Sequence, residues 1–166
     1  MSESRAYGLS LTRDLIRVEV DAVMYALEIA RIREIVNPLP IIELPRERAS
    51  VLGVSDYREE VIAIVDLRRL FGLPSREPTR RTKWIILESP RGPVGVVVDA
   101  VHDVFSSANN QLRAVPILDE RHHERGIRSA YRHDDRLVFL LDADRLAEPA
   151  MDVRLSDMPS LLPESS

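Results

Sequence analysis

The 166-residue sequence contains no cysteine, which excludes disulfide bonds, thiol nucleophiles and thiolate metal sites. Lysine is almost absent too, because Lys83 is the only one and arginine carries nearly all of the positive charge. No apolar run approaches the roughly 20 residues that a membrane-spanning helix needs. The polar N-terminus lacks the following apolar segment of a secretory signal. We therefore expect no membrane insertion and a cytoplasmic protein.

Patterns of known catalytic and cofactor sites are also missing. The sequence has no glycine-rich phosphate loop, no nucleophile elbow and no His-Glu-x-x-His metal helix. The pair His122-His123 lies among acidic residues, but neighbours on a strand point in opposite directions, so a polar loop is preferred over a metal site. The carboxylate pairs Glu59-Glu60 and Asp134-Asp135 fall at expected turns, where acidic residues are common. We predict no catalytic residues, no metal and no cofactor.

The formal net charge of −4 argues against a general nucleic-acid binder, because such domains usually carry a basic surplus that neutralises phosphates. One segment departs from this balance, since residues 74–83 are polar and rich in arginine. Two interpretations of it stay open, a phosphate-binding loop and a solvated linker, and the mixture with Glu77 and two prolines favours the linker.

One stretch of the sequence occurs twice and organises the expected fold. The first copy runs from Gly53 to Gly72, and the second begins at Gly126. Each predicts a strand, a charged turn, a second apolar strand and an aspartate, Asp66 or Asp142, that caps a short helix. With Tyr131-Arg132 matched to Tyr57-Arg58, the second copy is two residues longer in its turn. A unit this small cannot bury its own apolar face, so two half-domains sharing one core are expected.

The rest of the chain predicts two more hairpins, in 14–27 and 84–98, from apolar runs separated by turn residues. The prolines of 37–45 predict a stiff connector that packs against the core without joining a sheet.

The expected boundaries give three parts. We predict a flexible N-terminus over 1–13, one folded domain over 14–147 whose second half starts at about residue 84, and a C-terminal tail over 148–166.

Several motifs in one order carry a family resemblance. They are Tyr25-Ala26-Leu27-Glu28-Ile29 with Ile32-Arg33-Glu34-Ile35, Gly53-Val54-Ser55-Asp56-Tyr57-Arg58-Glu59 with Asp66-Leu67-Arg68, Gly95-Val96-Val97-Val98-Asp99 with Val101-His102-Asp103-Val104, and Leu140-Leu141-Asp142. Over about 15 to 147 the sequence resembles the CheW-like coupling proteins of bacterial chemotaxis.

The resemblance implies a mainly β fold of two SH3-like five-stranded β-barrel subdomains around a shared hydrophobic core, with short helices. It also implies a non-catalytic adaptor that couples the cytoplasmic tip of a chemoreceptor to the regulatory domain of a CheA-type histidine kinase. Such a protein is expected in the cytoplasm at receptor–kinase arrays.

This sequence departs from the family pattern at one turn. The family's Leu-Arg-Gly is Tyr57-Arg58-Glu59 here, its asparagine is Asp56, and its strand proline is Ala63. A glutamate disfavours the positive φ that glycine adopts easily, so a changed turn is expected.

By motif match, the family's receptor-contacting positions fall on Ile32, Arg58 and Val104. The resemblance implies that Ile32 and Val104 contact apolar side chains of a receptor helix and that Arg58 offers a fork of donors. In the alternative, Ile32 and Val104 are ordinary core residues and Arg58 pairs internally with Glu59 or Glu60.

Two other functions compete with the adaptor. A small β-barrel that binds nucleic acid is supported by the arginine-rich loop 76–83 with Trp84. An enzyme is supported only by His122-His123.

Overall fold

The computed structural model describes residues 14–45, 48–107, 113–115, 125–133 and 135–153. The expected flexible terminus (1–13), most of the expected tail (154–166) and the pair His122-His123 lie outside the described residues.

The first half of the chain forms five strands and two short helices. In order they are β1 (Asp14–Val20), β2 (Val23–Glu28), the 3₁₀ turn η1 (Ile29–Arg31), β3 (Ile32–Val36), β4 (Val51–Tyr57), β5 (Glu60–Asp66) and α2 (Leu67–Leu70). The proline-containing connector before β4 stays outside the sheets except at one bridge, between Ile42 and Val54.

The second half follows the same plan with one additional short strand. Its elements are β6 (Lys83–Leu87), β7 (Val94–Val98), β8 (Ala100–Ser106), β9 (Arg113–Val115), β10 (Ile127–His133), β11 (Arg136–Leu141), α4 (Ala143–Ala147) and η2 (Glu148–Asp152). None of the helices in the described part of the chain is long and apolar enough to cross a bilayer.

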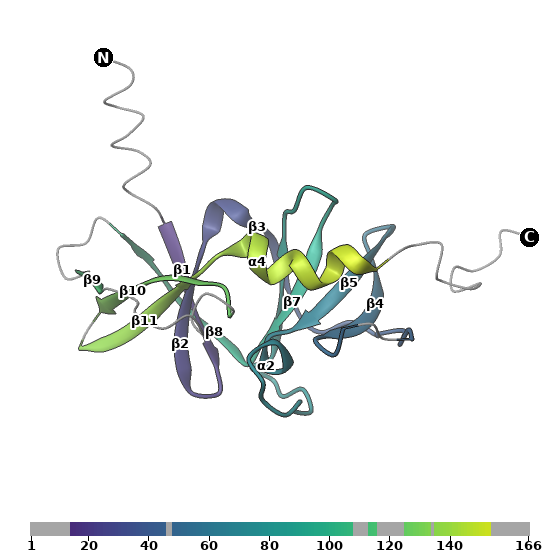
Figure 1. Ribbon diagram of the computed structural model, residues 1–166, viewed down its shortest axis with the longest axis horizontal. Helices are drawn as coiled ribbons and strands as arrows, with labels where there is room; N and C mark the ends of the chain where they lie inside the picture. Colours follow the sequence, from purple (N-terminus) through teal and green to yellow (C-terminus); the bar gives the residue numbers. More distant parts are fainter. Residues whose placement is uncertain (1–13, 46–47, 108–112, 116–124, 134, 154–166) are drawn as a thin grey trace, which may run out of the picture.

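The strands form two sheets, and each sheet draws on both halves of the sequence (Figure 1). The six-stranded sheet has the order β8-β1-β2-β11-β10-β9, and the five-stranded sheet has the order β3-β6-β7-β5-β4. The first hairpin of each half is thus inserted into the sheet that contains the repeat hairpin of the other half. A division of the chain near residue 84 separates the sequence halves, but it does not separate the sheets.

Parallel pairing joins the two contributions within each sheet. Strand β11 lies parallel to β2, and β5 lies parallel to β7, where Ile64 is paired with Gly95. A Cβ atom at Gly95 would lie 2.8 Å from Cδ1 of Ile64, so a side chain at this position would require the end of the Ile64 side chain to move.

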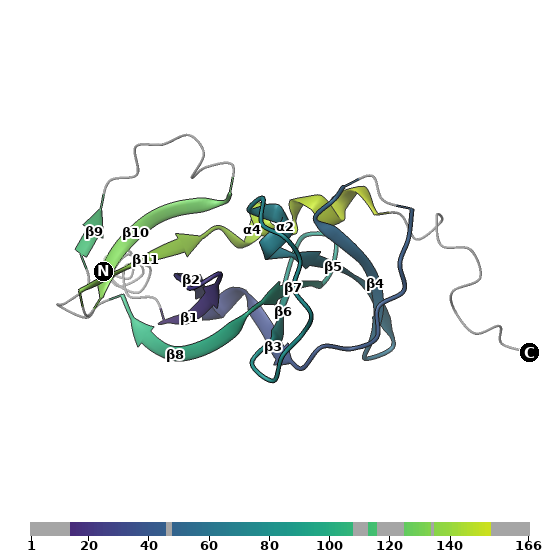
Figure 2. The same ribbon diagram turned by 90° about the horizontal axis from the view of Figure 1, so that it is seen from below.

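Both sheets curl into barrels, as Figure 2 shows. In the five-stranded barrel, Glu34 of β3 contacts Tyr57 at the far end of the strand order. In the six-stranded barrel, the ring of Phe105 in β8 stacks on that of His133 in β10, with centroids 4.9 Å apart. The expected mainly β fold of two SH3-like barrels is confirmed, with β9 as a sixth strand in one of them.

The structure corrects the alignment of the repeat. The β4–β5 hairpin ends with Tyr57 paired to Glu60, and the β10–β11 hairpin ends with His133 paired to Arg136, so both loops contain two residues. Each hairpin also has a register shift at the same place, after Val51 in one and after Ile127 in the other. The second turn is therefore not longer. Because the spacing between turn and capping aspartate is the same in both copies, Gly126 corresponds to Ser50 and not to Gly53.

The two aspartates cap their helices as the repeat predicts. The side chain of Asp66 accepts a hydrogen bond from the backbone N–H of Arg68 (3.1 Å), and that of Asp142 accepts one from Asp144 (3.0 Å). Each bond satisfies an N–H group that has no partner within its own helix.

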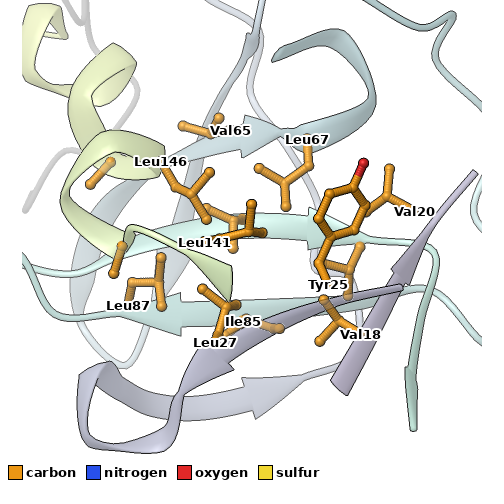
Figure 3. Close-up of a cluster of buried hydrophobic side chains, with 14 of the residues drawn as sticks. Val18, Val20, Tyr25, Leu27, Val65, Leu67, Ile85, Leu87, Leu141 and Leu146 are labelled. Atoms are coloured by element: carbon orange, nitrogen blue, oxygen red, sulfur yellow. The ribbon is translucent and has the colours of Figure 1, made fainter. Parts of the chain in front are cut away.

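The central strands bury both faces because they contribute to two kinds of core. Figure 3 shows the shared core, to which β1, β2, β5, β6, β11, α2 and α4 contribute. Its labelled members are Val18, Val20, Tyr25, Leu27, Val65, Leu67, Ile85, Leu87, Leu141 and Leu146. Alternate residues form smaller clusters inside the barrels, around Leu140 in one and Ile64 in the other.

The chain continues to pack beyond the expected boundary at residue 147. Ala150 and Val153 pack against the shared core, and Arg91 Nη1 donates to the carbonyl oxygen of Met151 (3.0 Å). The start of the expected tail is therefore part of the fold.

A single unfolding transition follows from the shared core. Leu141→Ala should lower the free energy of unfolding by about 2–5 kcal/mol, as buried leucine truncations commonly do. Leu137→Ala is the matched control, since Leu137 is exposed on the same strand. Calorimetry that resolved two transitions, with only one of them shifted by Leu141→Ala, would contradict a shared core.

The β4–β5 turn is a tight two-residue turn formed without glycine. Arg58 and Glu59 have φ values of 46° and 68°, so both central positions are left-handed, as a tight two-residue hairpin requires. Glu59 itself adopts positive φ, which carries a steric cost for a residue with a Cβ atom. The expectation that this turn differs from the family's stays a prediction.

Relief of that cost should stabilise the protein. Glu59→Gly is expected to raise the free energy of unfolding by about 1 kcal/mol, because glycine adopts positive φ without a steric penalty. The control, Asp56→Gly, places glycine at an exposed position within β4 and should destabilise instead. Urea denaturation of both variants checks the sign, and destabilisation by Glu59→Gly would contradict the argument.

Candidate functional site

The three predicted receptor-contacting residues occupy different parts of the fold. Ile32 begins β3, at one end of the five-stranded sheet, and is paired with Leu87. Arg58 lies in the β4–β5 turn of the same barrel. Val104 lies in β8, at one end of the six-stranded sheet, and is paired with Ile16.

Val104 and Ile32 differ in exposure. Val104 is 58% exposed, the highest value among the large apolar residues that the structure describes as exposed. Its interpretation as a core residue is therefore wrong. Ile32 is half-buried and packs against the shared core, so it combines a core role with a partly accessible surface.

Arg58 is held by a strand that is distant in sequence. Its Nε and Nη2 atoms donate to the two carboxylate oxygens of Glu34, both at 2.7 Å. The hydroxyl of Tyr57 donates to the same carboxylate at 2.6 Å, and the guanidinium lies 5.8 Å from the Tyr57 ring centroid. Arg58 thus pairs internally, but with Glu34 of β3 and not with the expected Glu59 or Glu60.

The arrangement fixes Arg58 without removing it from solvent. Its side chain is 67% exposed, and two of the five guanidinium N–H donors contact Glu34. A bidentate pair of this kind fixes the plane of the guanidinium and leaves the other donors to a partner. Glu34 also brings Arg58 to the strand that begins with Ile32.

The ion pair shifts the titration of both groups. Hydrogen bonds from Arg58 and Tyr57 lower the pKa of Glu34 from its ordinary 4.5 to about 2. The same carboxylate raises the pKa of Arg58 further above its ordinary value. Burial, reinforced by the hydrogen bond to Glu34, raises the pKa of Tyr57.

A second ion pair supports the turn from the outside. Arg33 donates to Glu60 (3.0 Å) and to Glu88 (2.9 and 3.2 Å). Arg33 and Glu34 therefore bind the β4–β5 hairpin together. Sequence reasoning missed both contacts, because β3 and this hairpin lie at opposite ends of the strand order and only barrel closure brings them together.

A buried arginine forms the other polar cluster of this barrel. The side chain of Arg68 is 9% exposed; Nη1 donates to Asp99 (2.5 Å), Nη2 to Asp21 (3.2 Å) and Nε to the carbonyl of Pro74 (2.9 Å). The sequence motifs that end in Arg68 and Asp99 thus meet in space. Their partners identify them as structural residues of the interior rather than as a reactive site.

Comparison with protein-family models matches residues 14–150 to the CheW-like domain. The chain belongs to this family. Among curated relatives, the probable chemotaxis protein CheW of Rhizobium etli is 30% identical over 137 residues, covering 81% of this chain and 86% of the relative. The chemotaxis protein CheW of Rhizobium meliloti is 29% identical over 132 residues, covering 80% and 85%.

A solved structure supports the fold independently. The scaffolding protein TtCheW of Thermoanaerobacter tengcongensis matches with a TM-score of 0.71 at 22% identity, covering 81% of this chain and 86% of that protein. The expected resemblance is therefore confirmed.

Family membership decides between the functions considered from the sequence. This CheW-family chain is a non-catalytic coupling adaptor of chemotaxis signalling. The alternative of a nucleic-acid-binding barrel is not supported by these matches. Among the residues that the structure describes, no group of three or more histidine, aspartate or glutamate side chains is arranged to hold a metal ion.

The Glu34–Arg58 pair predicts a defined pH dependence. Because the folded-state pKa of Glu34 lies below its ordinary value, the contribution to stability is complete above about pH 4.5 and is lost as the pH falls through about 2. Glu34→Gln should therefore destabilise the protein near neutral pH, and the difference from wild type should shrink over that window. Urea denaturation at stepped pH measures it; a difference independent of pH would contradict the proposed ion pair.

Proposed function

We propose that this protein couples the cytoplasmic tip of a chemoreceptor to the regulatory domain of a CheA-type histidine kinase. The match to the CheW-like domain over residues 14–150 carries this proposal, because it spans both barrels and not an isolated motif. The fold suits such a role, since two barrels that share one core present separate surfaces to different partners. Given these partners, the protein acts in the cytoplasm at receptor–kinase arrays.

The receptor site comprises Ile32, Arg58 and Val104. Val104 offers an exposed apolar side chain to a receptor helix, whose burial supplies affinity. Arg58 offers the guanidinium donors that Glu34 leaves available, and these suit a carboxylate or backbone carbonyls of the partner. Ile32, half-buried beside Glu34, adds apolar contact while anchoring β3 to the core.

The internal pairing of Arg58 supports this assignment rather than opposing it. A flexible exposed arginine loses side-chain entropy when it binds a partner. Here Glu34 has already fixed the guanidinium, so less entropy remains to be lost on binding. The left-handed turn at Arg58 and Glu59 places the side chain at the tip of the hairpin.

Charge substitution at Val104 tests the site directly. Val104→Glu should leave the protein folded, because the residue is exposed, and should weaken binding to a purified receptor-tip fragment by about 2 kcal/mol, as for a hot-spot residue. Binding to the purified kinase regulatory domain should be retained. Val23→Glu is the matched control, since Val23 is an exposed valine of the same sheet.

Arg58→Ala provides a second test that does not introduce a negative charge. It should also weaken receptor binding while circular dichroism stays native. Unchanged receptor affinity in both variants would show that this placement of the site is wrong. Failure of the wild-type protein to bind either partner would instead contradict the coupling function itself.

A further inference from the structure

The five-stranded barrel has a cleft at one end that the proposed receptor site does not use. Its volume is about 470 Å³. The apolar part of its lining consists of side chains that also pack around the barrel interior: Leu39, Ile41, Leu52, Trp84 and Val97. Ligand sites are common at barrel mouths, where interior side chains become accessible. The four smaller residues are half-buried, so the cleft offers apolar surface that a ligand can cover.

A second hollow of about 420 Å³ adjoins this cleft, and Arg76, Thr82 and Asp99 line both. The remainder of its wall is mainly cationic and hydroxylated, formed by Thr79, Arg80 and Arg81 together with Glu19. We call residues 75–82, which contribute to the walls of both hollows, the arginine loop. The first cleft thus combines an apolar wall with charged residues, among them Asp66, Arg68 and Arg69, whereas guanidinium and hydroxyl groups form most of the second hollow.

Local hydrogen bonds give the arginine loop a defined shape. The N–H of Thr79 donates to Oγ1 of Thr82 (2.8 Å), and the N–H of Arg81 donates to Oγ1 of Thr79 (3.1 Å). Lys83 Nζ donates to the carbonyl of Arg80 (3.1 Å) and to Oδ1 of Asn37 (2.8 Å), which ties the loop to the connector. Arg80 and Arg81 are therefore displayed from an ordered turn, as a preorganised site requires.

The carboxylates in the arginine-lined hollow are largely engaged elsewhere. Asp99 accepts from Arg68 (2.5 Å) and from the N–H of Asp21 (2.8 Å), and Glu19 contacts His102 (2.8 Å). The arginines meet these carboxylates only at longer distances, 4.0 Å for Arg76–Asp99 and 3.4 Å for Arg81–Glu19.

Among the arginines that line the hollow, Arg80 makes the fewest side-chain contacts within the described part of the chain. Within the described part of the chain, its side chain makes no hydrogen bond or ion pair, and its guanidinium donors are available to a ligand. Arg76 and Arg81 are also mostly exposed. The hollow thus favours an anion with several oxygens. Glu43 and Glu77 line the apolar cleft instead, so the preference for an anion is confined to the arginine-lined end.

We propose that this surface binds a short extended peptide that carries both acidic and apolar side chains. Its carboxylates contact Arg76, Arg80 and Arg81, and its apolar side chains enter the cleft above Trp84. Charge complementarity and the adjoining apolar wall together select this occupant. A nucleic acid is disfavoured because Trp84 is buried and offers no ring face on which a base could stack. The site lies beyond the receptor contacts proposed above, since none of Ile32, Arg58 and Val104 lines it.

Fluorescence anisotropy with a labelled peptide of alternating glutamate and leucine tests the proposal. The full-length protein should bind it saturably, and a peptide with serine in place of leucine should bind more weakly. The double variant Arg80→Glu/Arg81→Glu should reduce affinity at least about tenfold. The control double variant Arg132→Glu/Arg136→Glu has the same net charge, changes two exposed arginines of β10 and β11, and should bind as wild type.

Three outcomes would overturn the site. They are the absence of saturable peptide binding, equal weakening in the two double variants, and saturable binding of single-stranded oligouridylate without binding of the peptide. Binding of the receptor-tip fragment should be unchanged in Arg80→Glu/Arg81→Glu. That measurement separates failure of this proposal from failure of the coupling function.

Discussion

The burial of both faces of the central strands is the constraint on which this structure depends. Along β6, Trp84 and Ile86 point into the five-stranded barrel, whereas Ile85 and Leu87 point into the shared core. Neighbouring residues of a strand face opposite sides, so such a strand must be apolar at every position. One barrel alone would expose its outer apolar face to water. We therefore expect each barrel to depend on the other for its stability.

The exchange of hairpins between the halves places two equivalent ion pairs at the junction, with their charges reversed. Arg68 follows the cap of α2 and binds Asp99, which separates β7 from β8. At the corresponding position after the cap of α4, Asp144 accepts from Arg31 (2.6 Å), which precedes β3. The Arg68–Asp99 pair is buried and the Arg31–Asp144 pair is more exposed. Loss of a partner should therefore destabilise the protein more at Arg68, because it would leave a buried charge unpaired.

Residues outside the core clusters can change with little loss of stability. The residues of the proposed binding surfaces are mostly of this kind. Val104 lies on an end strand, Arg58 in a hairpin turn and Arg80 in a connecting loop, and none of them belongs to a core cluster. An adaptor without catalytic residues can change its partners through such positions. Glu59 is another such position, because it is exposed in the β4–β5 turn and outside the core clusters.

The sequence by itself determined the mainly β fold, the duplication, the helix caps Asp66 and Asp142 and the family, because these depend on local periodicity, capping chemistry and motif order. Only the tertiary structure showed the exchange of hairpins and the partner of Arg58. Glu34 and Arg58 are distant in the chain and meet because the barrel closes. The exposure of Val104 likewise depends on which strand ends the sheet. Apolar patterns specify that a residue can be buried, whereas strand order decides which neighbours bury it.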